Sequence, residues 1–228
     1  MSRTSKGFTL VELMIVIAII AVIAAVALPN LLASRLAANE ASAIATLRNL
    51  ITAQAQFQQR TRLDFDGDGI GEFGSFTELS GAGPGRMTGT LVPPILSSVF
   101  RVLSEDSAGH AAVNKSGYMF RIWLPSATQD GTCEDATGAF ATPVVPQPGE
   151  AVWCAYAWPA AYQQSGNRTF FVNQGGDILT AEVSTWEGLD NGPPADAAFT
   201  TANDITSAAA IDAVGQLPAT AGVWRKAR

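Results

Sequence analysis

The segment KGFTLVELMIVIAIIAVIAAVALPN, Lys6–Asn30, sets the organisation of this chain. Within Phe8–Leu28 every residue is apolar or small except Thr9 and Glu12. This run of 21 residues is about the length that an α-helix needs to cross the hydrocarbon core of a bilayer. Glu12 is out of place in such a span, because an unpaired carboxylate in lipid costs roughly 3 kcal/mol or more.

The residues in front of this run give it a direction across the membrane. Residues 1–7, MSRTSKG, carry Arg3 and Lys6, so the positive-inside rule places this end in the cytoplasm and the rest of the chain beyond the membrane. One alternative is an ordinary signal peptide cut at the AxA-like triplet 25–27, although such peptides have apolar runs of only about 7–15 residues. A plain membrane anchor is the other alternative. Neither alternative gives Glu12 a role.

The stretch KGFTLVEL, residues 6–13, resembles the leader junction of type IV pilins and of type II secretion pseudopilins. The resemblance implies that prepilin peptidase, a membrane-embedded aspartyl protease, cuts between Gly7 and Phe8 and methylates the new amino terminus of Phe8. It also implies that the amine of an incoming subunit meets the Glu12 carboxylate of a neighbour in a filament. Such a pair fixes the axial register, because any other stagger leaves a charge unpaired in low dielectric.

The helical pattern continues beyond the membrane segment, residues 8–28. No glycine occurs within 8–62, and Pro29 is the one proline there, so we expect a single helix ending near Arg60. Pro29 removes a backbone hydrogen bond and is expected to kink or loosen the helix. The resemblance implies that the helix melts near this proline during assembly.

The second part of the helix, residues 29–62, is predicted to be amphipathic. Residues at three- and four-residue steps form a stripe that we expect to pack on a head domain made of residues 63–228. The stripe comprises Leu32, Leu36, Ala43, Ile44, Leu47, Leu50, Ile51 and Gln54. The opposite, polar face carries Arg35, Asn39, Glu40, Arg48 and Gln56.

Four stretches rich in β-forming residues predict a small antiparallel sheet in the head. They are 117–124, 152–158, 169–173 and 178–183, and a glycine turn joins the last two. We also expect short helices near 95–101 and 207–214, and an exposed, loop-rich tail after Trp186. The predicted fold class is therefore α+β, a long amino-terminal helix packed on a small antiparallel sheet, which is also the pilin fold that the resemblance implies.

An acidic, glycine-rich stretch, DFDGDGIGEFGSF at 64–76, follows the helix. Its DxDxDG spacing matches the first half of an EF-hand calcium loop, in which alternate carboxylates on a tight turn converge on one cation. The candidate Ca²⁺ ligands are Asp64, Asp66, Asp68, Ile70 through its carbonyl, and Glu72. Ser75 stands where the bidentate glutamate of a full EF-hand belongs. A Ca²⁺ site and a solvated acidic turn therefore both stay open.

The two cysteines, Cys133 and Cys154, are too few for a disulfide scaffold and form no metal-binding motif. In a reducing compartment they are expected to be buried thiols. In an oxidising compartment one bridge closing roughly 20 residues is worth about 3 kcal/mol. Since the head lies outside the cytoplasm, we expect a Cys133–Cys154 disulfide.

Composition and motifs argue against several classes of function. The net charge of −6, without a basic patch, gives no support for a nucleic-acid partner. The sequence has no nucleophile elbow, phosphate-binding glycine loop or His/Cys metal cluster. His110, the single histidine, lies in a Gly/Ala loop and is expected at the surface. We expect no enzyme activity, and no cofactor apart from the candidate Ca²⁺.

The favoured function is a structural subunit of a type IV pilus-like filament. By the resemblance, its partners are copies of itself, prepilin peptidase and the assembly machinery of a pilus or a type II secretion system. The bacterial inner membrane holds it before assembly, and the cell surface or periplasm afterwards. The alternatives are a type II secretion pseudopilin and a secreted binding protein with an ordinary signal peptide.

Overall fold

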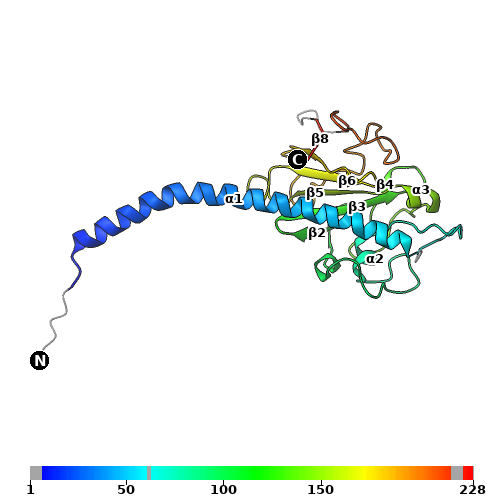
Figure 1. The fold of residues 1–228 in the computed structure, drawn as a ribbon, viewed down its shortest axis with the longest axis horizontal. Helices are drawn as coiled ribbons and strands as arrows, with labels where there is room; N and C mark the ends of the chain where they lie inside the picture. Colours follow the sequence, from blue (N-terminus) through cyan, green and yellow to red (C-terminus); the bar gives the residue numbers. More distant parts are fainter. Residues whose placement is uncertain (1–6, 61–62, 217–222, 228) are drawn as a thin grey trace, which may run out of the picture.

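The computed structural model describes residues 7–60, 63–216 and 223–227, and shows a long helix attached to a head (Figure 1). Helix α1, Leu10–Gln59, has 50 residues and is about 75 Å long at 1.5 Å per residue. It runs without a break through Pro29 and is bowed along its length (Figure 1). The long amino-terminal helix and the antiparallel sheet confirm the predicted α+β class.

The two halves of α1 have different surroundings. The first half is long and apolar enough to cross a membrane, none of that stretch is buried, and it projects clear of the head (Figure 1). The second half lies along the sheet and buries Ala43, Leu47, Leu50, Ala53 and Phe57. The side chains of the first half therefore need lipid or other apolar helices to cover them.

The head is built on one antiparallel sheet. Among the described residues its order is β1-β2-β3-β5-β6-β7-β8, and β4 pairs with β3. The strands are β1 Ser104–Glu105, β2 Ala111–Lys115, β3 Tyr118–Pro125, β4 Gly131–Thr132, β5 Cys154–Pro159, β6 Thr169–Asn173, β7 Leu179–Ala181 and β8 Arg225–Lys226. The four predicted strands correspond to β3, β5, β6 and β7.

Both faces of the sheet are covered, because β3 and β5 are buried at every position. On the inner face, Phe120, Ile122 and Phe170 lie in one buried cluster with the later part of the α1 stripe, Ala43, Leu47 and Leu50. The prediction that the stripe begins at Leu32 is wrong, because Leu32 is 47% exposed and the buried part of α1 begins only at Glu40. On the outer face, side chains of β3, β5 and β6 pack against the carboxy-terminal part of the chain. The tail residues in this outer layer are Trp186, Ala197, Ala198, Phe199, Ile205, Ala210 and Trp224.

The prediction of an exposed tail is therefore wrong: the segment after Trp186 is the second layer over the sheet. The helix predicted near 207–214 is also absent, since this segment consists of turns and bends, with an isolated bridge between Phe199 and Ala209. Ala209 and Ala210 pack there against the outer face of the sheet. Tertiary packing thus overrides the weak helix preference of this alanine-rich stretch.

Three short helices complete the described part of the head. The 3₁₀ helix η1, Ser98–Arg101, agrees with the helix predicted near 95–101. Helices α2, Phe76–Ser80, and α3, Pro146–Ala151, were not predicted. The sequence does carry a signal for α2, because Ser75 and Glu78 form a capping box at its start.

Polar residues of α1 also join it to the head. For Glu40 and Asn39 this corrects their predicted place on the opposite, polar face, whereas Gln54 was predicted on the packed side. Glu40 is buried and pairs with Arg168, with Oε2 of Glu40 2.6 Å from Nη2 of Arg168. Asn39 donates from Nδ2 to the carbonyl of Ser165 at 2.9 Å. Gln54 exchanges two hydrogen bonds with the backbone of Gly74. These bonds satisfy polar groups that α1 buries.

Candidate functional site

The amino-terminal end of α1 holds Glu12 in a capping box with Thr9. The Thr9 hydroxyl accepts the Glu12 N–H at 3.2 Å. In return, Oε2 of Glu12 accepts the Thr9 N–H at 2.8 Å and the Thr9 hydroxyl proton at 2.7 Å. Thr-x-x-Glu is the sequence signature of this cap, and a carboxylate here also complements the helix dipole. Glu12 therefore has partners within a single chain.

The side chains around this cap are exposed to solvent. Phe8 is 84% exposed, and the apolar residues that follow as far as Leu28 are exposed or nearly so. Gly7 and Phe8, the predicted cleavage pair, are exposed and lie before the helix in a segment without regular secondary structure. Of the predicted leader, residues 1–6 lie outside the described residues.

The acidic loop at the far end of α1 brings three predicted ligands together. One carboxylate oxygen from each of Asp64, Asp66 and Asp68 lies within 4.8 Å of the others. Backbone N–H groups hold the loop in shape: Asp64 accepts from Gly67 at 2.7 Å and from Gly69 at 3.1 Å. Such a cluster has the hard oxygen donors that Ca²⁺ prefers.

The two remaining predicted ligands are placed differently. Ile70 donates its N–H to Oδ1 of Asp68 at 2.8 Å, so its backbone belongs to the loop. Glu72 turns inward and is fully buried, with Oε1 accepting the Phe65 N–H at 2.9 Å. Burial raises the pKa of Glu72, and the nearby charge of Asp64 adds to this, against hydrogen bonds and Arg86, which lower it.

The predicted disulfide is absent, since both cysteines are buried free thiols. Cys154 pairs with Trp123 of β3, whereas Cys133 follows β4, which pairs with β3 on the side of β2. Strand β3 thus separates them by two strand spacings, about 10 Å, and a disulfide needs Cα atoms about 4.4–6.8 Å apart. Burial raises the pKa of Cys133 to about 12. The order of the strands keeps these thiols apart, and the spacing of the cysteines in the sequence could not indicate that order.

Comparison with known proteins adds two family matches. A family model for the prokaryotic N-terminal methylation motif matches residues 2–28. A second model, described as a protein of unknown function (DUF2950), matches residues 24–185, well over half of the chain. The first match spans the junction at Gly7 and Phe8 together with Glu12.

Two curated relatives are pilus proteins. The chain is 54% identical over 56 residues to the type IV wide pilus major component PilA4 of Thermus thermophilus, and 45% identical over 53 residues to the type IV major pilin protein PilA of Myxococcus xanthus. The chain belongs to the type IV pilin family and to the DUF2950 family. The alignments cover 25% and 23% of this pilin, and 43% and 24% of those relatives. No solved structure matches it.

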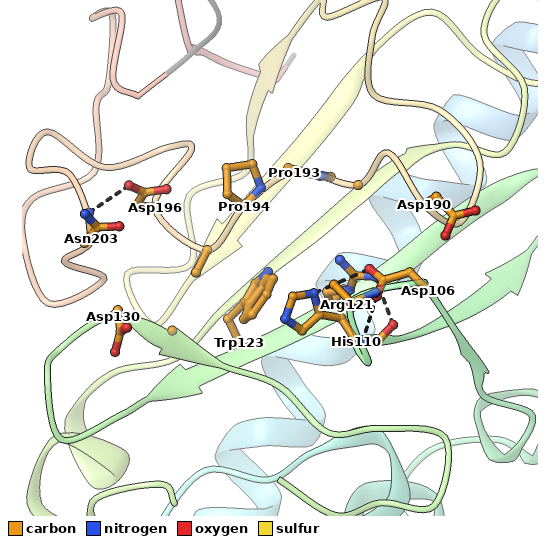
Figure 2. A pocket seen from close by; sticks show the side chains of 14 residues that line it. Asp106, His110, Arg121, Trp123, Asp130, Asp190, Pro193, Pro194, Asp196 and Asn203 are labelled. Atoms are coloured by element: carbon orange, nitrogen blue, oxygen red, sulfur yellow. Dashed lines mark hydrogen bonds and ion pairs between the residues drawn. The ribbon is translucent and has the colours of Figure 1, made fainter. Parts of the chain in front are cut away.

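The outer face of the pilin's head carries a pocket of 360 Å³, shown in Figure 2. Arg121 is one of the residues that line it, and donates from Nη2 to Oδ2 of Asp106 at 2.7 Å. The His110 ring lies edge-on to Trp123, with centroids 5.0 Å apart, so His110 is half-buried rather than a plain surface residue. Burial disfavours the ionised form of Asp106. Hydrogen bonds, first that from the backbone N–H of His110, and the charge of Arg121 together outweigh this effect and lower the pKa of Asp106.

The ionic groups of this pocket serve the packing of the outer layer. The Arg121 guanidinium lies 5.6 Å from the ring centroid of Trp123 and 5.3 Å from that of Trp158. The ion pair with Asp106 neutralises the positive charge of Arg121 at the place where the tail covers the sheet. Sequence analysis did not single out this cluster, although an arginine inside the apolar run YMFRIWLP was a signal for a buried partner.

Proposed function

We propose that this pilin is a non-enzymatic structural subunit of a type IV pilus-like filament, assembled through the apolar half of α1. Prepilin peptidase cleaves it between Gly7 and Phe8 and methylates the new amino terminus at Phe8. Residues 8–28 hold the subunit in the inner membrane as a single span, with the head outside the cytoplasm. Copies of the chain, joined by the assembly machinery, then form the filament.

This proposal rests on one observation: the apolar half of α1, which begins with Glu12 in its first turn, is not covered by the head. None of that half is covered by the head, so a bundle of neighbouring helices replaces lipid around it without exposing apolar surface to water. Glu12 enters this bundle already paired with Thr9. A neighbour's Phe8 amine then neutralises its charge, which the cap alone leaves uncompensated.

The structure, in which α1 is continuous through Pro29, corresponds in this proposal to the subunit before assembly. The proline gives no backbone N–H to the helix, so unwinding near it breaks fewer hydrogen bonds than elsewhere in α1. Local unwinding there lets the heads adjust to one another while residues 8–28 stay helical. Unwinding near the proline is what the resemblance to type IV pilins implies for Pro29 of this chain.

The amino terminus of the mature protein tests the proposal. Mass spectrometry and amino-terminal sequencing of protein from sheared fibres are expected to find N-methylphenylalanine at Phe8. An amino terminus at Leu28 or Asn30 would show an ordinary signal peptide and overturn the proposal, and an uncut Met1 in the fibres would do the same.

A type II secretion pseudopilin is the alternative, and the same chain carries the signals for both. Electron microscopy of sheared cell-surface material, with and without this protein, separates them. Surface fibres that contain the protein support the pilus. Processed protein confined to the periplasm and inner membrane supports the pseudopilin.

A further inference from the structure

The pocket on the outer face of the head is lined by charged groups that the fold does not pair. Its volume of 360 Å³ lies within the range of small-molecule sites, about 300–1,000 Å³ (Figure 2). Asp130, Asp190 and Asp196 line it, and none of them forms an ion pair with a described residue. Arg121 is already paired with Asp106, so the pocket as a whole is negatively charged.

Hydrogen bonds hold these three carboxylates in separate places. Asp190 accepts the Ser107 N–H at 2.9 Å, Asp196 accepts the Asn203 N–H at 2.8 Å, and Asp130 accepts two side-chain hydroxyls. Figure 2 shows Asp190 toward one end of the pocket, and Asp130 and Asp196 toward the other. No three acidic groups among the described residues of this pocket lie close enough to share a metal ion. The carboxylates are therefore spaced for an extended ligand.

A buried donor without an acceptor lies among these carboxylates. Arg121 is only 2% exposed, and its Nε and Nη2 are bonded to the Ala111 carbonyl, to Asp106 and to the His110 carbonyl. Its Nη1 forms no hydrogen bond to a residue that the structure describes. Gly192, which also lines the pocket, lies over this nitrogen, and a Cβ at 192 would be 3.2 Å from it. Glycine at this position thus leaves Nη1 uncovered on the side of the pocket.

Apolar surface completes the lining. Figure 2 shows the segment of Pro193 and Pro194 on one side of the pocket, and Trp123 with His110 on the other. Trp123 is 5% exposed, and its Nε1 is buried without a hydrogen-bond partner among the described residues, so a second donor next to Arg121 lacks an acceptor. Flat apolar walls with a few fixed polar groups are typical of sites for small organic molecules.

The chemistry of the lining selects the class of ligand. The unpaired carboxylates repel an anion. An organic cation would bring a second positive charge to Arg121 and would give its Nη1 no acceptor. A hydroxyl group donates one hydrogen bond and has two lone pairs to accept others. A neutral molecule with several hydroxyls therefore matches both the donor and the carboxylates.

We propose that this pocket binds a saccharide. One of its oxygens accepts from Nη1 of Arg121, and its hydroxyls donate to Asp190 and Asp196 in charge-assisted hydrogen bonds. Its C–H surface packs against Trp123 and Pro194. The pocket belongs to the outer layer, whose buried cluster contains no residue of α1. The site thus goes beyond the proposed filament function and does not depend on how α1 assembles.

Saturation-transfer difference NMR and calorimetric titration of the full chain test the proposal. The chain is kept in lauryldimethylamine oxide, because a maltoside or glucoside detergent itself carries a sugar. The probes are glucose, galactose, mannose and N-acetylglucosamine, with L-lysine as the organic cation. We expect at least one of these sugars to bind at one site per chain, and no binding of L-lysine.

Asp190→Asn with Asp196→Asn keeps an acceptor for the Ser107 and Asn203 N–H groups and removes both charges. This double variant should bind the sugar roughly 10-fold more weakly or worse, because hydrogen bonds to a charged acceptor are stronger than those to a neutral one. Glu182→Gln with Asp212→Asn removes two exposed carboxylates outside the lining, and is the matched control with wild-type affinity.

Wild-type protein that binds none of the four sugars at millimolar concentration would overturn the proposal, and so would binding of L-lysine alone. Equal affinities of the wild type and the double variant would place the sugar elsewhere and overturn the assignment to this pocket. Because Tm is measured for each variant, a misfolded variant is recognised and replaced by the single Asp190→Asn change. The titration uses the unassembled chain, so a failure to form fibres does not affect it.

Discussion

Arg168, in the segment before β6, donates from both Nε and Nη2 to one carboxylate oxygen of Glu40 in α1, at 2.8 and 2.6 Å. The second oxygen of Glu40 accepts the Asn167 N–H at 3.1 Å. Glu40 is the first buried residue of α1, counted from its amino-terminal end. This cluster therefore fixes the direction in which the apolar half of α1 leaves the head.

Arg168→Gln should lower the free energy of unfolding of the head by about 1–2 kcal/mol. The value lies below that of a fully buried ion pair, because the Arg168 side chain is 38% exposed. Denaturant unfolding followed by tryptophan fluorescence measures it. Arg48→Gln, on an exposed position of the same helix, is the control and should change stability by less than about 0.5 kcal/mol. Equal effects of the two variants would show that the pair does not stabilise this joint.

Glu12→Gln separates the two roles of Glu12. Glutamine can still accept the Thr9 N–H and keep the cap, but it has no charge for a neighbour's amine. We expect normal cleavage and a large loss of fibres for both Glu12→Gln and Glu12→Ala, measured as the yield of sheared filaments. Thr9→Val, which removes the hydroxyl and keeps the carboxylate, is the control and should retain most of the fibres. Normal fibres from Glu12→Gln would rule out charge pairing as the source of register.

The sequence was sufficient to predict those parts of the fold that have a long or strong pattern. The helix α1 follows from 50 residues without glycine, and β3, β5 and β6 follow from runs of β-branched and aromatic residues. The outer layer could not be predicted in the same way. Its residues, such as Phe199, Ile205 and Trp224, pack singly from turns, an isolated bridge and irregular segments, and do not recur at a regular sequence spacing. The nearly continuous apolar sequence of β3, interrupted only by Arg121, was the indirect sign that a second layer covers the sheet.

The candidate sites could likewise be predicted only where their residues are close together in the sequence. The Asp64, Asp66 and Asp68 triplet is local in sequence, so its spacing predicted the cluster correctly. The disulfide prediction was wrong because the order of β4, β3 and β5 is a long-range property, which the spacing of the two cysteines does not contain.

The two thiols should be inert in the folded head. Cys133 and Cys154 are buried, and burial raises the pKa of each, so little thiolate forms at neutral pH. We expect no labelling of the native protein by a maleimide, and labelling of both cysteines after unfolding without a reductant. Intact mass spectrometry counts the labels. Unfolded protein that takes up a label only after reduction would show that a disulfide forms despite the intervening strand.

Glu134 should make the head less stable as the pH rises. Burial raises its pKa to about 7 from an ordinary 4.5, against the hydrogen bonds from Thr77 and Ser75, which lower it. The folded state thus holds a proton that the unfolded state loses above about pH 4.5, so this contribution is full below that pH and is lost toward pH 7. Relative to Glu134→Gln, the wild type should lose a few kcal/mol across this window.

The check is denaturant unfolding of both proteins at several pH values, with Glu182→Gln as the baseline for removing an exposed carboxylate. Subtracting the variant's curve cancels the titration of groups that the two proteins share. Parallel curves for wild type and Glu134→Gln would show that Glu134 has no such shift.

Trp224 is the centre of the outer layer and the most sensitive position of the tail. It is fully buried, its ring lies about 6 Å from those of Tyr156, Phe171 and Trp186, and its Nε1 donates to the Ala197 carbonyl at 2.9 Å.

Trp224→Ala should therefore cost about 3–5 kcal/mol and uncover apolar surface of the sheet, measured as a lower Tm and increased binding of a hydrophobic dye. Val214→Ala, at a 54% exposed position of the same tail, is the matched control and should behave as wild type. The prediction concerns the head alone, because Trp224 belongs to the outer layer of the head, whose buried cluster contains no residue of α1. A Trp224→Ala protein as stable as Val214→Ala would mean that the tail lies on the sheet without stabilising it.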